Sequence, residues 1–130
     1  MEYRVCRNDP APYNDLNGKI SLLGLGTMRL PLRDAADQTS IDEEKAQEIF
    51  DYAYAHGVNY FDTAYPYHGG MSEKFCGKAL AKYPRASYHL ASKLPGWLLK
   101  CDEDVPRIFN EQLANCRTDY FVFLPRSLCA

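Results

Sequence analysis

The chain has 130 residues, of which 46% are hydrophobic and 25% are charged, and its formal net charge is −2. This length and composition are typical of one globular domain, and the absence of a long basic run argues against a nucleic-acid partner. No apolar run approaches the ~20 residues that a membrane helix needs, and residues 1–10 lack the apolar core of a secretion signal.

The five cysteines are scattered along the chain and form no C-x-x-C pair; they are Cys6, Cys76, Cys101, Cys116 and Cys129. An odd number at irregular spacing argues against a disulfide framework and against a metal site. We therefore expect reduced thiols, no metal and a cytoplasmic protein.

Residues 1–18 are rich in Pro, Asn, Asp and Gly, so we expect an irregular or hairpin-like lead-in. The apolar run 20–26 ends in glycines and predicts a buried strand, followed by a loop over 27–40. Further strands are predicted over 58–62, 88–93 and 120–124, and helices over 40–56, 72–82 and 104–116.

Sequence signals mark both ends of the helix predicted over 40–56. Ser40 and Glu43 have the spacing of a capping box, and Gly57 suits the residue just past the helix end. Asp102 or Asp104 is expected to cap the third helix. The apolar stripes expected to face the core are Ala46, Ile49, Phe50 and Ala53; Phe75, Cys76, Ala79 and Leu80; and Val105, Ile108, Phe109, Leu113 and Cys116.

Alternating strands and helices at this spacing predict parallel strands with right-handed crossovers, either in an open doubly wound sheet or in a (β/α)₈ barrel. Residues 24–29 begin like a dinucleotide-binding fingerprint, but Arg29 stands where a third glycine belongs and a loop follows in place of a helix. We therefore favour an α/β fold with about four parallel strands and three helices, the N-terminal half of a (β/α)₈ TIM barrel.

Three residues near the carboxyl ends of successive strands form the main candidate site. Asp62 ends one strand, Tyr67 lies in the loop after it, and Lys93 ends the next strand. A phenol is a proton donor at neutral pH, and a nearby ammonium lowers its pKa towards neutrality. A carboxylate can hold that ammonium by a charge-assisted hydrogen bond. Together they predict an acid/base unit for protonating a carbonyl oxygen.

Each of these residues also has a structural interpretation. Asp62 alone is more often a loop cap, Tyr67 alone is more often a packing residue, and Lys93 alone is most often solvated. Their joint placement at neighbouring strand ends favours the catalytic interpretation.

Several segments in order resemble the aldo-keto reductase family. They are residues 24–31, 57–67, 72–73, 77–80 and 92–95, and the resemblance spans roughly residues 18–124. Residues 93–97 and 108–113 are most similar to a bacterial or archaeal subgroup that often carries a ferredoxin-like C-terminal extension.

The resemblance implies an NADPH-dependent oxidoreductase that reduces an aldehyde or ketone to an alcohol. The sequence itself does not distinguish NADPH from NADH. It assigns the proton-donor role to Tyr67 and tuning roles to Lys93 and Asp62. The nicotinamide end of the cofactor would be lined by Gly26, Thr27 and Asp62. The substrate, a small carbonyl compound, would face an apolar wall of Met28 and Trp97, although Trp97 is equally well read as loop packing.

Two departures from the family pattern qualify this reading. The family's catalytic histidine slot holds Ser127, or Arg126 if one residue is deleted, and His68 is expected to be solvated in its loop. The chain is also about half the length of a (β/α)₈ barrel. We therefore expect residues 1–130 to be a truncated domain that is inactive alone. The alternative is a non-catalytic half-barrel remnant or an interaction protein that self-associates through open sheet edges.

Overall fold

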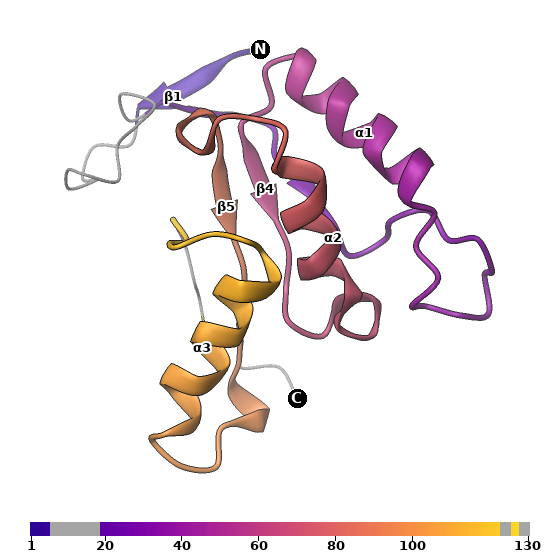
Figure 1. Ribbon diagram of the computed structural model, residues 1–130. Coiled ribbons are helices and arrows are strands. Elements are labelled where there is room, and N and C mark those ends of the chain that lie inside the picture. The colour runs from indigo at the N-terminus through magenta and orange to yellow at the C-terminus, as the bar shows by residue number, and fades with distance from the viewer. Residues whose placement is uncertain (6–18, 123–125, 128–130) are drawn as a thin grey trace.

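The computed structural model describes residues 1–5, 19–122 and 126–127, and its centre is a parallel sheet (Figure 1). The sheet has three strands in the order β3 (Leu25–Gly26), β4 (Tyr60–Asp62) and β5 (His89–Ala91). Gly26 pairs with Asp62, and Asp62 pairs with Ala91. Because the strands are parallel, their carboxyl ends lie at one edge, as the sequence predicted.

Helices alternate with these strands. The described residues contain α1 (Glu43–Ala55) between β3 and β4, α2 (Met71–Leu80) between β4 and β5, and α3 (Asp104–Asn115) after β5. Short 3₁₀ turns follow β4, precede β5 and precede α3; they are η1 (Tyr67–Gly70), η2 (Arg85–Ser87) and η3 (Gly96–Leu98). Both α1 and α2 lie to one side of the sheet (Figure 1). None of the helices described is long and apolar enough to span a bilayer.

The predicted strand over 20–26 is divided in two. Its first part belongs to β2 (Lys19–Ser21), which pairs antiparallel with β1 (Tyr3–Val5) in a hairpin near the starting ends of β4 and β5 (Figure 1). Its last part is β3. The division falls after Ser21, whose hydroxyl donates to the carbonyl of Leu23 at 2.6 Å and closes a local turn. Residues 6–18 of the predicted lead-in lie outside the described residues.

The predicted fourth strand is described only in part. The Val122 amide donates to the carbonyl of Leu90 at 3.0 Å, although residues 120–122 do not have strand conformation. Further on, β7 (Arg126–Ser127) pairs in parallel with β6 (Leu94–Pro95). Val122 therefore lies beside β5 and β7 lies beside β6, while residues 123–125 lie outside the described residues.

The capping box predicted for α1 is wrong. The cap is Asp42, whose carboxylate accepts from the Lys45 amide at 3.3 Å. Ser40 closes the preceding loop, because its hydroxyl donates to the Asp37 carbonyl at 2.7 Å and accepts from the Asp34 amide at 3.0 Å. The predicted helix end is confirmed: Gly57 has a φ of +88°, in the left-handed region that favours glycine.

The cap predicted for α3 is also absent. No side chain caps this helix, and the Asp104 carboxylate accepts instead from the amides of Lys100 and Cys101, at 2.8 and 3.3 Å. The apolar stripes are confirmed in part. The predicted inward residues of α2 are all buried, whereas Ile49 of α1 and Val105 of α3 are exposed.

Stacked aromatic rings join the helices to the sheet. The Phe50 ring of α1 stacks on Phe61 of β4 with centroids 5.3 Å apart, and meets Phe75 of α2 edge-on at 5.5 Å. All three side chains are buried. Since alternate residues of a strand face opposite sides, Phe61 pointing at the helices places Tyr60 and Asp62 on the other face of the sheet.

Helix α2 packs closely at Gly77 against the end of α3. A Cβ added there would lie 2.6 Å from the Asn115 carbonyl oxygen and 2.6 Å from the Cys116 carbonyl carbon, which are backbone atoms that cannot rotate away. We predict that Gly77→Ala lowers the free energy of unfolding by about 1–3 kcal/mol in urea titrations. The control is Gly26→Ala, because an added Cβ there meets no atom within 4 Å and stability should change by at most about 1 kcal/mol. Equal stability of Gly77→Ala and wild type would contradict this packing.

Candidate active site

An ion pair joins the ends of β4 and β5. The Lys93 ammonium donates to the carboxylate of Asp62 and, at 3.1 Å, to the main-chain carbonyl of Thr63. The two charged side chains are 27% and 33% exposed, less than either partner of the ion pairs Lys78–Glu43 and Lys82–Asp51. Partial burial strengthens such a pair relative to one fully in water.

Tyr67 lies against the same ammonium. The Lys93 Nζ atom is 5.0 Å from the centroid of the Tyr67 ring. Tyr67 is the first residue of η1, the turn that follows β4. The structure therefore brings together Asp62, Tyr67 and Lys93, the three residues that the sequence predicted to share one site. Their catalytic roles stay predictions.

The electrostatics of this cluster favour a charged lysine. Burial opposes the ammonium, but the hydrogen bonds of Lys93 with Asp62 and Tyr67, together with the Asp62 charge, outweigh burial and raise the lysine pKa above its ordinary 10.5. Lys93 is therefore a cation throughout the neutral range. A fixed positive charge beside a phenol stabilises the phenolate that remains after the phenol gives up its proton.

Gly26 and Thr27 lie beside Asp62 in different surroundings. Gly26 is the register partner of Asp62 and is exposed, with open space where a side chain would be. Thr27 is fully buried; its amide and its hydroxyl both donate to the Asp62 carbonyl, at 2.9 and 3.0 Å. The Thr27 side chain thus contacts the backbone of Asp62.

Buried hydroxyls continue this contact to α2. The Ser72 hydroxyl lies 2.9 Å from the hydroxyl of Thr27 and 2.9 Å from that of Thr63. All three residues are completely buried. This cluster connects the ends of β3 and β4 to the first turn of α2.

A second buried network surrounds Glu73. Its carboxyl oxygen Oε1 accepts from the Ser92 hydroxyl at 2.6 Å and from the Gln112 amide at 2.7 Å, and Oε2 accepts from Asn115 at 3.1 Å. The same Gln112 amide nitrogen also donates to the Lys93 carbonyl at 3.1 Å. Glu73, Ser92 and Gln112 are all fully buried, so the network is screened from water.

Sequence reasoning missed these two networks. Gln112 lies four residues from Ile108 and from Cys116, and Glu73 lies three and four residues before Cys76 and Gly77. That spacing places each polar residue on the buried face of its helix. A polar residue within an apolar stripe was the signal that could have revealed them.

The two residues predicted to form the substrate wall are both exposed. Met28 is 58% exposed on the loop after β3, and Trp97 is 44% exposed in η3. Trp97 lines a groove of about 380 Å³ together with residues that include Tyr65, Leu98 and Glu111, and Met28 does not line it. The substrate roles of both residues stay predictions.

The expectation of a solvated His68 is wrong. His68 is 5% exposed, and its Nε2 atom accepts from the Leu30 amide at 3.1 Å. Its Nδ1 atom lies 2.9 Å from the Gln38 carbonyl, so one neutral tautomer satisfies both contacts. The residue also has a φ of +54°. The imidazole fastens the loop between β3 and α1 to the turn that carries Tyr67.

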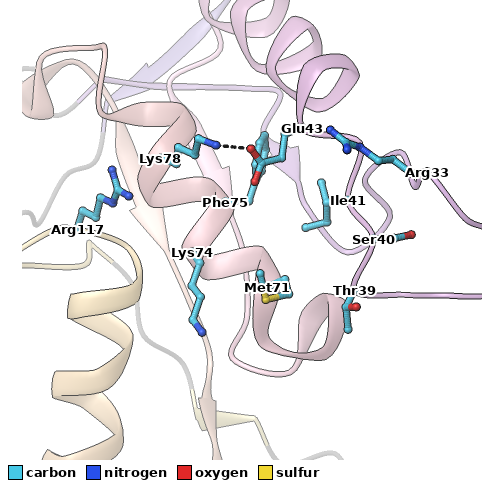
Figure 2. A pocket seen from close by; sticks show the side chains of 10 residues that line it. All are labelled: Arg33, Thr39, Ser40, Ile41, Glu43, Met71, Lys74, Phe75, Lys78 and Arg117. Atoms are coloured by element: carbon cyan, nitrogen blue, oxygen red, sulfur yellow. Dashed lines mark hydrogen bonds and ion pairs between the residues drawn. The ribbon is translucent and has the colours of Figure 1, made fainter.

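A larger groove of about 620 Å³ lies elsewhere, between α2 and the loop before α1. It is lined by residues that include Arg33, Lys74, Lys78 and Arg117, and the Lys78 ammonium pairs with Glu43, which also lines the groove (Figure 2). None of the three predicted catalytic residues lines it. Across residues 1–5, 19–122 and 126–127, no three His, Cys, Asp or Glu side chains cluster as a metal site requires.

The parallel β/α units, with a lysine, a carboxylate and a phenol near the strand ends, assign the chain to the class of parallel β/α barrel proteins. Comparisons with known proteins specify it further. The family model described as "Aldo/keto reductase family" matches residues 22–123. A putative aryl-alcohol dehydrogenase from Schizosaccharomyces pombe is 40% identical over 78 residues, which cover 58% of this chain and 22% of that protein.

Solved structures agree with this assignment. The holo form of aldo-keto reductase AKR11C1 from Bacillus halodurans superposes with a TM-score of 0.72 and 28% identity, over 95% of this chain and 39% of that one. An aldo-keto reductase from Klebsiella pneumoniae in complex with NADPH has the same fold, with a TM-score of 0.68 and 23% identity, over 99% of this chain and 42% of that one.

The chain belongs to the aldo/keto reductase family, and its fold is the N-terminal half of a (β/α)₈ barrel. The fold class predicted from the sequence is thereby confirmed. The chain spans about a fifth of the length of the curated relative and about two fifths of the two solved structures.

The contacts of His68 generate a stability prediction. We predict that His68→Leu lowers the free energy of unfolding by about 1–3 kcal/mol, because the buried Leu30 amide loses its acceptor. His56→Leu is the matched control: His56 is exposed, and its removal should change stability by about 0.5 kcal/mol or less. Urea titrations of the two variants give the comparison, and equal effects would contradict a structural role for His68.

Proposed function

We propose that this chain supplies the acid/base half of an NADPH-dependent aldo-keto reductase, which reduces an aldehyde or ketone to an alcohol. The observation that carries the proposal is the contact of the Lys93 ammonium with both the Asp62 carboxylate and the Tyr67 ring. Membership of the family and the Klebsiella pneumoniae structure with NADPH support the choice of cofactor.

The surroundings of Gly26 fit a flat nicotinamide ring. The space beside Gly26 is open and adjoins Asp62, its register partner. Gly26 and Asp62 would line the ring, and Thr27 would act there by holding the Asp62 backbone. When bound, the cofactor supplies the hydride that reduces the carbonyl carbon.

The chain's own residues manage the proton. The Tyr67 hydroxyl donates a hydrogen bond to the carbonyl oxygen of the substrate, and gives up its proton as negative charge develops on that oxygen. The Lys93 ammonium stabilises the phenolate that remains. Asp62 holds the ammonium in position and keeps it charged.

A second candidate is a non-catalytic half-barrel that self-associates. The observation that favours it is the edge strand β3, which pairs with β4 alone in the described sheet. An open strand edge presents unpaired backbone groups to another chain. The free thiols Cys76, Cys101 and Cys116 support a cytoplasmic setting for either candidate.

Binding of NADPH tests the proposal. We expect added NADPH to quench the fluorescence of Trp97, which is the sole tryptophan, with saturation at micromolar cofactor. Asp62→Asn should weaken this binding, because the carboxylate would line the nicotinamide and fixes Lys93. The exposed Asp37→Asn serves as the matched control and should bind as wild type does.

The two candidates give opposite results. Saturable quenching that the Asp62 variant weakens supports a formed cofactor site. The absence of any response, combined with a dimeric or larger mass by light scattering, would overturn the reductase proposal and favour the self-associating half-barrel.

A further inference from the structure

Two adjacent residues at the start of α2 contact both strand ends that carry the ion pair. Ser72 and Glu73 are each fully buried in the first turn of the helix. Ser72 bonds to the hydroxyl of Thr63, the residue after Asp62. Glu73 bonds to the hydroxyl of Ser92, the residue before Lys93. One helical turn therefore holds both strand ends.

On the Asp62 side, Ser72 contacts two threonine hydroxyls, and one of these threonines contacts the Asp62 backbone. Ser72 also lies 2.9 Å from the Thr27 hydroxyl, which in turn donates to the Asp62 carbonyl. The carbonyl of Thr63 accepts from the Lys93 ammonium at 3.1 Å. Ser72 therefore helps to fix two carbonyl oxygens. One is that of Asp62, which Thr27 contacts, and the other is that of Thr63, which the Lys93 ammonium contacts.

The contacts on the Lys93 side form a relay. Glu73 accepts from Ser92 and from Gln112, and the Gln112 amide nitrogen donates onward to the Lys93 carbonyl. A lysine side chain has four rotatable methylene groups, so it needs a fixed backbone if its ammonium is to stay on one carboxylate. The relay fixes the backbone at Ser92 and Lys93 through these hydrogen bonds.

We propose that Ser72 and Glu73 are positioning residues that set the separation of Asp62 and Lys93, and thereby keep the Lys93 ammonium charged and held between Asp62 and Tyr67. The inference rests on the proposed function for its catalytic meaning, since it concerns the same acid/base unit. Glu73 and Ser72 themselves touch no reacting group. They act through Thr63, Ser92 and Gln112.

The test follows the free-amine fraction of Lys93. A small acylating reagent modifies only unprotonated lysines, and mass spectrometry reports the rate at each site. Across pH 7–10 the rate for Lys93 in the wild type should be lower than for the exposed Lys82. If the positioning is lost and the Lys93 pKa falls by about one unit, the rate should rise about tenfold.

Two variants of graded severity are compared with one control. Glu73→Ala removes the centre of the relay, and Ser92→Ala removes a single hydroxyl from it. The control is Glu43→Ala, which removes the exposed partner of Lys78 and should leave Lys93 unchanged (Figure 2). The assay uses the whole chain and needs neither cofactor nor turnover, so its failure is separate from a failure of NADPH binding.

Thiol labelling separates positioning from unfolding. Cys76 and Cys116 are buried, and burial raises the pKa of both thiols, that of Cys76 to about 11, so both resist alkylation while the chain is folded. A tenfold faster Lys93 in either variant, with both thiols still protected, supports the proposal. Wild-type Lys93 rates in a variant with protected thiols would overturn it, and so would rates that rise only together with thiol exposure in both variants.

Discussion

The ion pair between Asp62 and Lys93 is the interaction on which the proposed acid/base chemistry depends. It joins the ends of β4 and β5 across the face of the sheet opposite the aromatic core. Without a fixed carboxylate, a half-buried ammonium would lose charge to burial, and the phenol of Tyr67 would lose its cationic neighbour. The three groups therefore have to be held as a unit.

Apolar packing and polar contacts stabilise different parts of the structure around that unit. The rings of Phe50, Phe61 and Phe75 bind the helices to the sheet and decide which face of β4 is turned towards them. Buried polar groups then fix the strand ends. The close approach of α2 and α3 at Gly77 brings Glu73 and Gln112 within hydrogen-bonding distance.

The sequence predicted the order of strands and helices, the buried face of α2, and the meeting of Asp62, Tyr67 and Lys93. These features follow from local periodicity and from the rule that parallel strands end at one edge. It did not predict the division of the 20–26 segment, because a turn closed by Ser21 leaves no mark in hydrophobicity. Ser40 met the capping pattern, yet Asp42 offered the helix a competing cap and Ser40 closed the loop.

Long-range polar partners were beyond sequence reasoning. Ser92 and Gln112 are 19 and 39 residues from Glu73, and His68 is 38 residues from Leu30. Each is a residue type that is usually solvated, so composition alone assigns it to the surface. Only the fold shows that Ser92, His68 and the amide nitrogen of Gln112 have partners inside the molecule, whereas the buried side-chain oxygen of Gln112 has none among the described residues.

The most direct test of the account is an NMR titration of the Lys93 side chain, labelled by reductive methylation, in the wild type, Asp62→Asn and Tyr67→Phe. The account predicts that the wild-type pKa of Lys93 lies above the ordinary lysine value of 10.5 and that both substitutions lower it. A wild-type Lys93 that titrates at the ordinary lysine value, and responds to neither substitution, would contradict the claim that these three residues form one acid/base unit.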